Sequence, residues 1–230
     1  MKLSTTTFLT TGLILISFTL FAQNKKTTYY DSLENITTWE AYYGQVFEGR
    51  YTPSYDKQKN EGRLIRTSEE EYQEQLKITK EGITTTKRVG EICPDFEVED
   101  IEGNRYSKEE LKGKIIVLNF WFIGCASCEM ELSALNKLRS LYSDNPDVIF
   151  LSFAKNDKEK LKDFLPSHPI NYQVIPTEKK YIKKNFVLNA FPTHIIVDEK
   201  GVISYCAVGT GIGILDILKS EIESIQNRNQ

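Results

Sequence analysis

The 230-residue sequence has only two histidines and four cysteines, and this scarcity excludes most metal centres. A structural zinc site usually takes four Cys or His ligands, arranged in closely spaced pairs. Here a C-x-x-C pair occurs once, at Cys125 and Cys128, while Cys93 and Cys206 stand alone. We therefore expect no bound metal and no cofactor.

The sequence also lacks an excess of either charge, since its formal net charge is -3 at pH 7. Lys and Glu are interspersed along most of the chain instead of forming blocks, and we find no internal repeat and no low-complexity tract. A nucleic-acid-binding surface requires clustered Lys and Arg, so we expect no nucleic-acid partner. The hydrophobic fraction of 40% is normal for a globular protein with a packed core.

An apolar run without charge, Phe8 to Phe21, lies near the first residue of the chain. It follows the positive charge of Lys2 and precedes the small residue Ala22, the pattern of a secretory signal peptide over residues 1–22. The run is short for a transmembrane helix, although an uncleaved signal anchor stays open as an alternative. We therefore expect a periplasmic or otherwise extracytoplasmic protein, anchored if the signal is retained, in a compartment where disulfides persist.

Residues 23–88 are polar, rich in Tyr, Thr, Glu and Lys, and poor in large apolar residues. A helix is expected from Ser68, because Ser68 and Glu71 have the spacing of a capping box and Gly82 can end it. Residues 60–66 give only a weak strand signal. We expect a poorly defined N-terminal extension of unknown role that does not fold alone, and that packs on the second part or is partly loose.

Residues 89–227 alternate between apolar runs and segments with helical spacing. We expect buried strands at 114–122 and 148–153 and a short strand at 172–175. A short hairpin is expected around a turn at 102–104, and a second hairpin at 193–207. Helices are expected at 128–142, 157–165, 179–186 and 212–225. Strands that alternate with helices imply parallel pairing, and the last hairpin adds antiparallel strands. The predicted fold is α/β, with a mixed central sheet flanked by helices.

The pair Cys125 and Cys128 falls where a buried strand ends and a helix begins. There the free backbone N–H groups and the helix dipole favour a thiolate on the first cysteine. A thiolate is the species that attacks a disulfide, so we predict Cys125 as the nucleophile and Cys128 as the resolving thiol. The alternative is a structural disulfide, which would stabilise little because the closed loop is so short.

Phe191 and Pro192 directly precede the predicted strand at residues 193–197. Proline is allowed at the first position of a strand, and its peptide bond is either cis or that of an ordinary turn. A cis proline facing the dithiol would expose the backbone of Phe191 to a substrate chain.

Several motifs of the second part of the chain occur together: Asn119-Phe120-Trp121, Cys125-Ala126-Ser127-Cys128, Glu131, Cys93-Pro94-Asp95-Phe96, and Phe191-Pro192-Thr193 with Asp198 and Gly201. With them the chain, from about Gly90 to Ile225, resembles the TlpA/ResA group of exported, thioredoxin-like thiol–disulfide oxidoreductases. The resemblance implies a thioredoxin-like fold with a cis Pro192 beside Cys125. It implies that Glu131 tunes the thiols or moves protons, although an equal alternative is that this carboxylate only interacts favourably with the helix dipole.

The chain departs from this family at several positions around the predicted site. Gly124 replaces the usual Trp before the first cysteine, and Ser133 replaces a common Pro. Asn119 stands where typical thioredoxins carry a buried Asp. A dithiol function tolerates these changes, because both sulfurs and the helix are retained.

We therefore predict a thiol–disulfide oxidoreductase that reduces or exchanges disulfides in exported proteins. The resemblance suggests apocytochrome c as the first candidate substrate, and general repair of exported proteins is equally open. Its partners would be such substrates and a membrane electron donor, and we expect a monomer. Cys125, Cys128 and Glu131 are the expected catalytic residues, while the expected substrate-binding residues are Phe191, Pro192 and Trp121, the last with only one edge near the site.

Three other functions stay open at this stage. A copper-handling module would use the thiolates and His194, which is otherwise a strand residue. A non-catalytic interaction protein would work through residues 23–88. A peroxidase is disfavoured because no Thr lies just before Cys125. Cys93 and Cys206 are expected to be buried apolar residues, or else to pair with each other.

Overall fold

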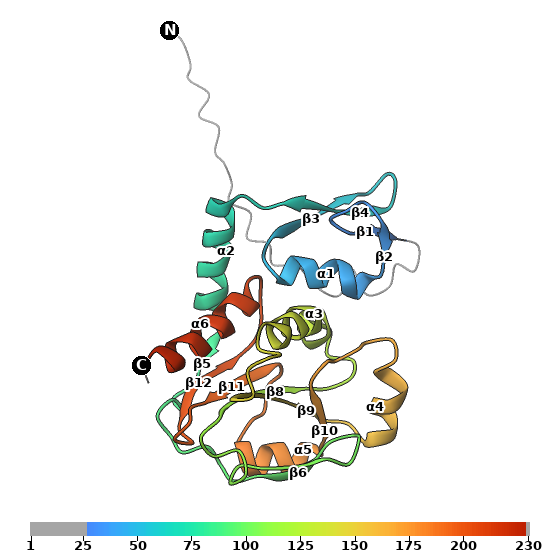
Figure 1. Cartoon of the computed structure of the whole chain (residues 1–230). Helices are drawn as coiled ribbons and strands as arrows, with labels where there is room; N and C mark the ends of the chain where they lie inside the picture. Colours follow the sequence, from blue (N-terminus) through green and yellow to red (C-terminus); the bar gives the residue numbers. More distant parts are fainter. Residues whose placement is uncertain (1–26, 229–230) are drawn as a thin grey trace.

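The computed structural model describes residues 27–228, which form a small N-terminal unit and a larger domain (Figure 1). The predicted signal peptide at 1–22 lies outside the described residues. Within the described part of the chain, no helix is long and apolar enough to cross a membrane.

A four-stranded sheet and one helix form the core of the N-terminal unit. The strand order is β2-β1-β4-β3, with β1 parallel to β4 and the other neighbours antiparallel. Helix α1 begins after Thr38, whose hydroxyl accepts a hydrogen bond from the N–H of Ala41. The elements are β1 (Thr28–Tyr30), β2 (Ile36–Thr37), α1 (Trp39–Phe47), β3 (Tyr51–Asp56) and β4 (Glu61–Arg66).

The core of this unit consists largely of tyrosine rings. The ring of Tyr42 lies 5.0 Å from that of Tyr29 and 5.1 Å from that of Tyr43, measured between centroids. The hydroxyl of Tyr42 donates to the backbone carbonyl of Arg63 at 2.9 Å, which ties α1 to β4. Aromatic pairs bury large areas, and few apolar residues therefore suffice for this core. The sequence predicted only a weak strand in this region, whereas the structure contains a complete small sheet.

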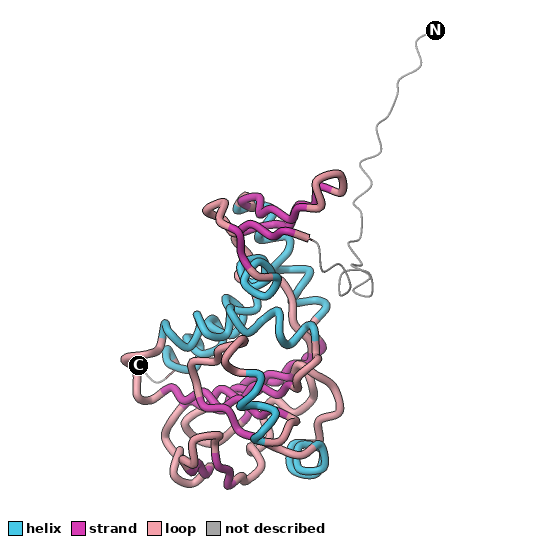
Figure 2. The backbone as a smooth tube through the Cα atoms, turned by 90° about the vertical axis from the view of Figure 1, so that its right-hand side faces the viewer, coloured by secondary structure: helices cyan, strands magenta, loops and turns pink. Residues whose placement is uncertain are grey.

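The N-terminal unit packs on the larger domain, as one of the two sequence alternatives expected. Helices α1 and α3 (Ala126–Leu141) lie between the two sheets (Figures 1 and 2). Lys137 on α3 donates to Glu48, at the end of α1, over 2.7 Å. Helix α2 (Glu69–Gly82) has the predicted capping box, and its Tyr72 hydroxyl donates to Asp216 of α6 (Ile214–Asn227).

The larger domain contains a six-stranded mixed sheet in the order β10-β9-β8-β11-β12-β5. Neighbouring strands are parallel from β8 to β10 and antiparallel from β8 through β11 and β12 to β5. All seven residues of β8 are buried, which explains its continuous apolar sequence. The strands are β5 (Thr84–Thr85), β8 (Ile115–Trp121), β9 (Val148–Ala154), β10 (Gln173–Pro176), β11 (Thr193–Val197) and β12 (Ile203–Val208).

Two hydrophobic layers cover the sheet. Helices α3 and α6 lie against one face, and the opposite face holds a cluster that includes Phe120, Phe153 and Phe186. The predicted first hairpin is present as β6 and β7, at the far side of the sheet from α3 (Figure 1). The remaining elements are β6 (Glu97–Glu99), β7 (Arg105–Ser107), α4 (Lys158–Phe164), α5 (Lys179–Tyr181) and the π-helical turn Ile182–Phe186. The mixed α/β sheet expected from the sequence is therefore confirmed.

Candidate active site

Cys125 and Cys128 form a disulfide at the first turn of α3. Cys125 is the N-cap residue, and its side chain makes no capping hydrogen bond. Its sulfur therefore lies beside backbone N–H groups that have no partner within the helix. Cys125 is 7% exposed, whereas Cys128 is completely buried. Only the first cysteine offers any surface to a reactant.

Hydrogen bonds hold the loop that leads into the helix. The N–H of Ile123 donates to Asn156 Oδ1 at 2.9 Å, which joins the loop to the segment after β9. The N–H of Gly124 donates to Glu129 Oε1 at 2.7 Å. Gly124 has φ = +89°, a left-handed conformation that suits glycine and disfavours residues with a side chain.

Phe191 lies close to the dithiol at the start of β11. The Phe191–Pro192 peptide bond is cis, as the family resemblance implied. Phe191 packs against the apolar cluster that contains Cys125 and Cys128. Within the described residues, neither the N–H nor the C=O of Phe191 makes a backbone hydrogen bond. This peptide edge is therefore free to pair with another chain.

A row of polar side chains crosses the sheet beneath α3. The strand register places Asn119 of β8 beside Ser152 of β9 and His194 of β11. Glu131 enters this row from α3, and its Oε2 lies 3.2 Å from His194 Nε2. Asn119 Nδ2 donates to Glu131 Oε1 at 3.4 Å. Glu131, Asn119, Ser152 and His194 are all at most 3% exposed.

Glu131 and Cys128 lie three residues apart on α3 and are both completely buried, so they share the helix face that covers the sheet. Tyr172 also lies near this carboxylate. Burial raises the pKa of Tyr172, and the charge of Glu131 raises it further. The tyrosine therefore stays neutral beside Glu131.

The structure corrects the expectation that an edge of Trp121 contributes to substrate binding. Trp121 is 0% exposed, and its indole N–H donates to Ser152 Oγ at 2.7 Å. Its ring therefore supports the site from below and has no surface with which to contact a docked protein. Burial of both ring and donor is the usual arrangement for a core Trp.

The structure places His194 and the two remaining cysteines in the buried interior. The His194 ring is bonded to Glu131 and Asn119, and the described residues include no group of three or more Cys, His, Asp or Glu that could hold a metal. Cys93 and Cys206 are buried and unpaired, so the alternative in which they form a disulfide is not realised. Burial raises the pKa of the Cys93 thiol to about 11.

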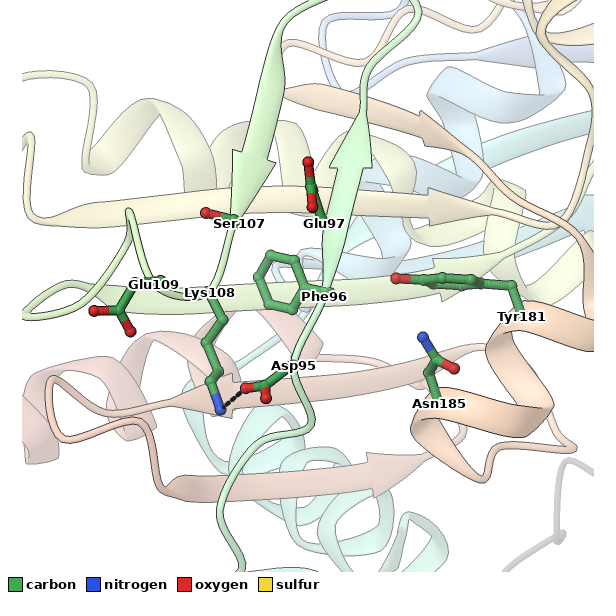
Figure 3. A pocket seen from close by; sticks show the side chains of 8 residues that line it. All are labelled: Asp95, Phe96, Glu97, Ser107, Lys108, Glu109, Tyr181 and Asn185. Carbon is green, nitrogen blue, oxygen red and sulfur yellow. Dashed lines mark ion pairs between the residues drawn. The ribbon is translucent and has the colours of Figure 1, made fainter.

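A hollow on the hairpin side of the domain is separate from the dithiol (Figure 3). Its lining includes Phe96, Tyr181 and the ion pair between Lys108 and Asp95. Lys108 also donates to the carbonyl of Cys93 at 2.8 Å. Since the only cation of its lining is already paired, this hollow offers no free positive charge to a ligand.

Asn156 and Phe122 belong to the site, although the sequence interpretation passed over them. Asn156 lies just beyond the end of β9, and Phe122 directly follows β8. Residues just beyond the carboxyl ends of parallel strands often carry function. That position was the signal that could have identified both.

Comparison with known proteins agrees with this geometry. Residues 89–206 match the AhpC/TSA family. The chain belongs to this family. It is 32% identical over 123 residues to the thioredoxin-like protein YneN of Bacillus subtilis, covering 53% of this chain and 72% of that one. It is 27% identical over 122 residues to the thiol-disulfide oxidoreductase ResA of Bacillus cereus, covering 53% and 70%.

Solved structures share the fold at lower identity. A putative thiol:disulfide interchange protein DsbE from Chlorobium tepidum superposes with a TM-score of 0.55 at 19% identity, covering 60% of this chain and 96% of that one. A putative protein disulfide isomerase from Bacteroides thetaiotaomicron gives 0.55 at 22% identity, covering 62% and 92%. The larger domain is thioredoxin-like, and the protein is a thiol–disulfide oxidoreductase. The N-terminal unit, residues 27–88, precedes the family match.

Proposed function

We propose that the protein is an extracytoplasmic reductase of protein disulfides that acts through Cys125 and Cys128. The observation that carries the proposal is the unequal burial of two bonded cysteines at the start of α3. Cys125 retains some exposure and Cys128 has none. This asymmetry supports an attack on the substrate by Cys125 and an internal, resolving attack by Cys128.

The reaction starts from the reduced dithiol. The Cys125 thiolate attacks one sulfur of the substrate disulfide, forms a mixed disulfide and releases the other substrate sulfur as a thiolate. The Cys128 thiolate then attacks the Cys125 sulfur and releases the second substrate thiol. Two electrons pass to the substrate, and the Cys125–Cys128 disulfide remains. A dithiol donor, which we place in the membrane, reduces it again.

Glu131 supports the resolving step in this proposal. Cys128 must lose its proton before it can attack, yet it is buried from water. Glu131 lies on the same face of α3. Because bulk water does not reach this interior, the neighbouring carboxylate is the group that accepts the proton. Phe191 supports the first step, because its unpaired peptide edge can bind the substrate backbone beside Cys125.

The signal-like sequence at 1–22 and a Cys125–Cys128 pair placed to form a disulfide both suit an oxidising compartment. Exported proteins with disulfides, apocytochrome c among them, are the substrates that we propose for such a location. A monomer suffices, since both cysteines and the Phe191 edge come from one chain.

The test is the reduction potential of the Cys125–Cys128 pair, measured by equilibration with dithiothreitol or glutathione, acid quenching and mass spectrometry. We expect a reversible two-electron couple well below the roughly -120 mV of a strong disulfide-forming oxidant. A potential near that value would instead assign the protein to disulfide formation. A pair that stays locked, with no reversible couple, would refute both directions.

A further inference from the structure

A row of side chains continues the sheet register beyond the carboxyl ends of the parallel strands. The pairing of β8 with β9 ends at Trp121 and Ala154, so the next pair along is Phe122 and Lys155. The antiparallel pairing of β8 with β11 begins with Phe120 opposite Thr193. Two residues further along the chain from Phe120, on the same face of the sheet, this register places a residue of the Pro192 segment opposite Phe122.

That residue is Phe191, and the three side chains contact one another. The Phe122 and Phe191 rings lie 5.5 Å apart in an edge-to-face arrangement. Lys155 Nζ lies 3.8 Å from the centroid of Phe122 and 5.1 Å from that of Phe191. We call Phe122, Phe191 and Lys155 the aromatic–lysine platform. It lies beside the dithiol, because Phe122 and Phe191 both pack against the cluster of Cys125 and Cys128.

The charge of Lys155 is not neutralised by a carboxylate. Among residues 27–228, Lys155 forms no ion pair, and its ammonium instead faces the two rings. A cation held over aromatic faces keeps N–H donors available on the side away from the rings. The segment is fixed at its backbone, since the N–H of Lys155 donates to the carbonyl of Trp121 at 2.8 Å.

An open depression of about 590 Å³ adjoins the platform, and Lys155 also lines it. Its other charged groups nearly balance. Asp157 is already occupied, since it pairs with Lys160 at 2.7 Å and caps α4. Lys179 and its neighbour Glu178 carry opposite charges. Of the cations that line the depression, Lys155 is the one that contacts the rings of the platform.

We propose that the aromatic–lysine platform recognises an acidic side chain beside the disulfide-bonded cysteine of a polypeptide substrate. The inference rests on the proposed function, because it assumes that a substrate chain pairs with the Phe191 peptide edge. A substrate residue next to the attacked cysteine then lies over the two rings. The methylene groups of Glu or Asp contact the rings, and the carboxylate pairs with Lys155.

The test compares two synthetic peptides, each with one intramolecular disulfide and identical except for Glu or Lys beside one cysteine. The rate at which each peptide oxidises the pre-reduced full-length protein is followed by acid quenching and mass spectrometry. We expect the Glu peptide to react at least about five times faster at low salt, and the ratio to fall as salt rises.

Variants of Lys155 assign that ratio to the platform. Lys155→Met should bring the ratio close to one, and Lys155→Glu should reverse it. Lys57→Glu is the matched control, because Lys57 is an exposed residue of the β3–β4 turn and its substitution alters the net charge equally. The control should keep the wild-type ratio.

The outcomes separate this inference from the proposed function. Hydroxyethyl disulfide, a small uncharged substrate, reports in the wild-type protein whether the dithiol reduces disulfides at all. If it does, but the two peptides react equally, the platform proposal is wrong while the reductase proposal stands. A preference for Glu that survives in Lys155→Met would also overturn the platform. No reaction with any disulfide would refute the proposed function itself.

Discussion

Glu131 Oε2 lies 3.2 Å from His194 Nε2, and neither side chain has any exposed surface. This contact joins α3, which carries both active-site cysteines, to β11, the strand that follows Pro192. The two halves of the site are thereby tied together below the surface. The pair also occupies the region where typical thioredoxins carry one buried Asp, because Asn119 donates to the same carboxylate.

The first prediction concerns this pair. His194→Ala should lower the free energy of unfolding by about 3–5 kcal/mol, because it removes one partner of a buried polar pair and leaves the other without compensation. Glu131→Ala should cost a similar amount for the same reason. Urea unfolding of the oxidised protein measures both changes.

The double variant supplies the control. If the two groups act as a pair, Glu131→Ala with His194→Ala should cost less than the sum of the single changes, by about 0.5–3 kcal/mol. Additive losses would show that each residue is held by other neighbours and that the Glu131–His194 contact contributes little.

The second prediction concerns the order of attack. With a disulfide-bonded peptide, reduced Cys128→Ser should accumulate a mixed disulfide at Cys125, because the resolving thiol is absent. Reduced Cys125→Ser should form almost none, because Cys128 is completely buried. Non-reducing gels and mass spectrometry detect the adduct. Equal trapping by both variants would contradict the assignment of roles.

Much of the larger domain was predictable from the sequence, because its strands and helices have strong and distinct patterns. The continuous apolar run of β8 and the spaced leucines of α3 identified both elements within one or two residues. The capping box at Ser68 located the start of α2 correctly. In each case a local pattern agreed with the tertiary environment.

The N-terminal sheet was not predictable in the same way. Its core uses Tyr29, Tyr42 and Tyr43, residues that a hydrophobic pattern does not separate from surface positions. Its strand pairing is partly non-local, since β1 pairs with β4 across α1 and β3. The Glu131–His194 contact was hidden for a related reason. The two residues lie 63 positions apart in the sequence, and their contact depends on the register of the strand that carries His194.

The third prediction concerns the buried thiols and alkaline pH. Burial raises the pKa of Cys93 from 9.0 to about 11, so the folded state holds this proton more tightly than the unfolded state. The stability that this provides is complete below pH 9 and is lost as pH rises from 9 to 11. The midpoint of urea unfolding should therefore fall over that range.

Cys93→Ala isolates the contribution of this thiol. The variant should lose less stability than the wild type between pH 9 and pH 11, by on the order of 2 kcal/mol at the upper end. Part of the alkaline loss should persist, because burial also raises the pKa of Tyr205 to about 12. Identical pH profiles for variant and wild type would show that Cys93 ionises equally easily in both states.

The last prediction concerns the contact between the N-terminal unit and the dithiol helix. A Cβ atom added at Gly44 of α1 would lie 2.4 Å from the Cβ of Ser133 on α3, closer than side chains approach. Gly44→Ala should therefore push the two helices apart and cost about 1–3 kcal/mol, even though Ala is the better helix former. Gly82→Ala is the matched control, because nothing lies within 4 Å of the added atom. That variant should be neutral or slightly stabilising in urea unfolding.

A compensating change tests whether the steric contact is the cause. Ser133→Gly removes the atom that Gly44→Ala would meet, so adding it to Gly44→Ala should recover part of the lost stability. By itself, Ser133→Gly should cost about 1 kcal/mol, the usual penalty for glycine inside a helix. A double variant as unstable as the sum of the two single changes would mean that α1 is not seated against α3 at Ser133. Recovery would establish that Ser133 seats the N-terminal unit against the helix of Cys125 and Cys128.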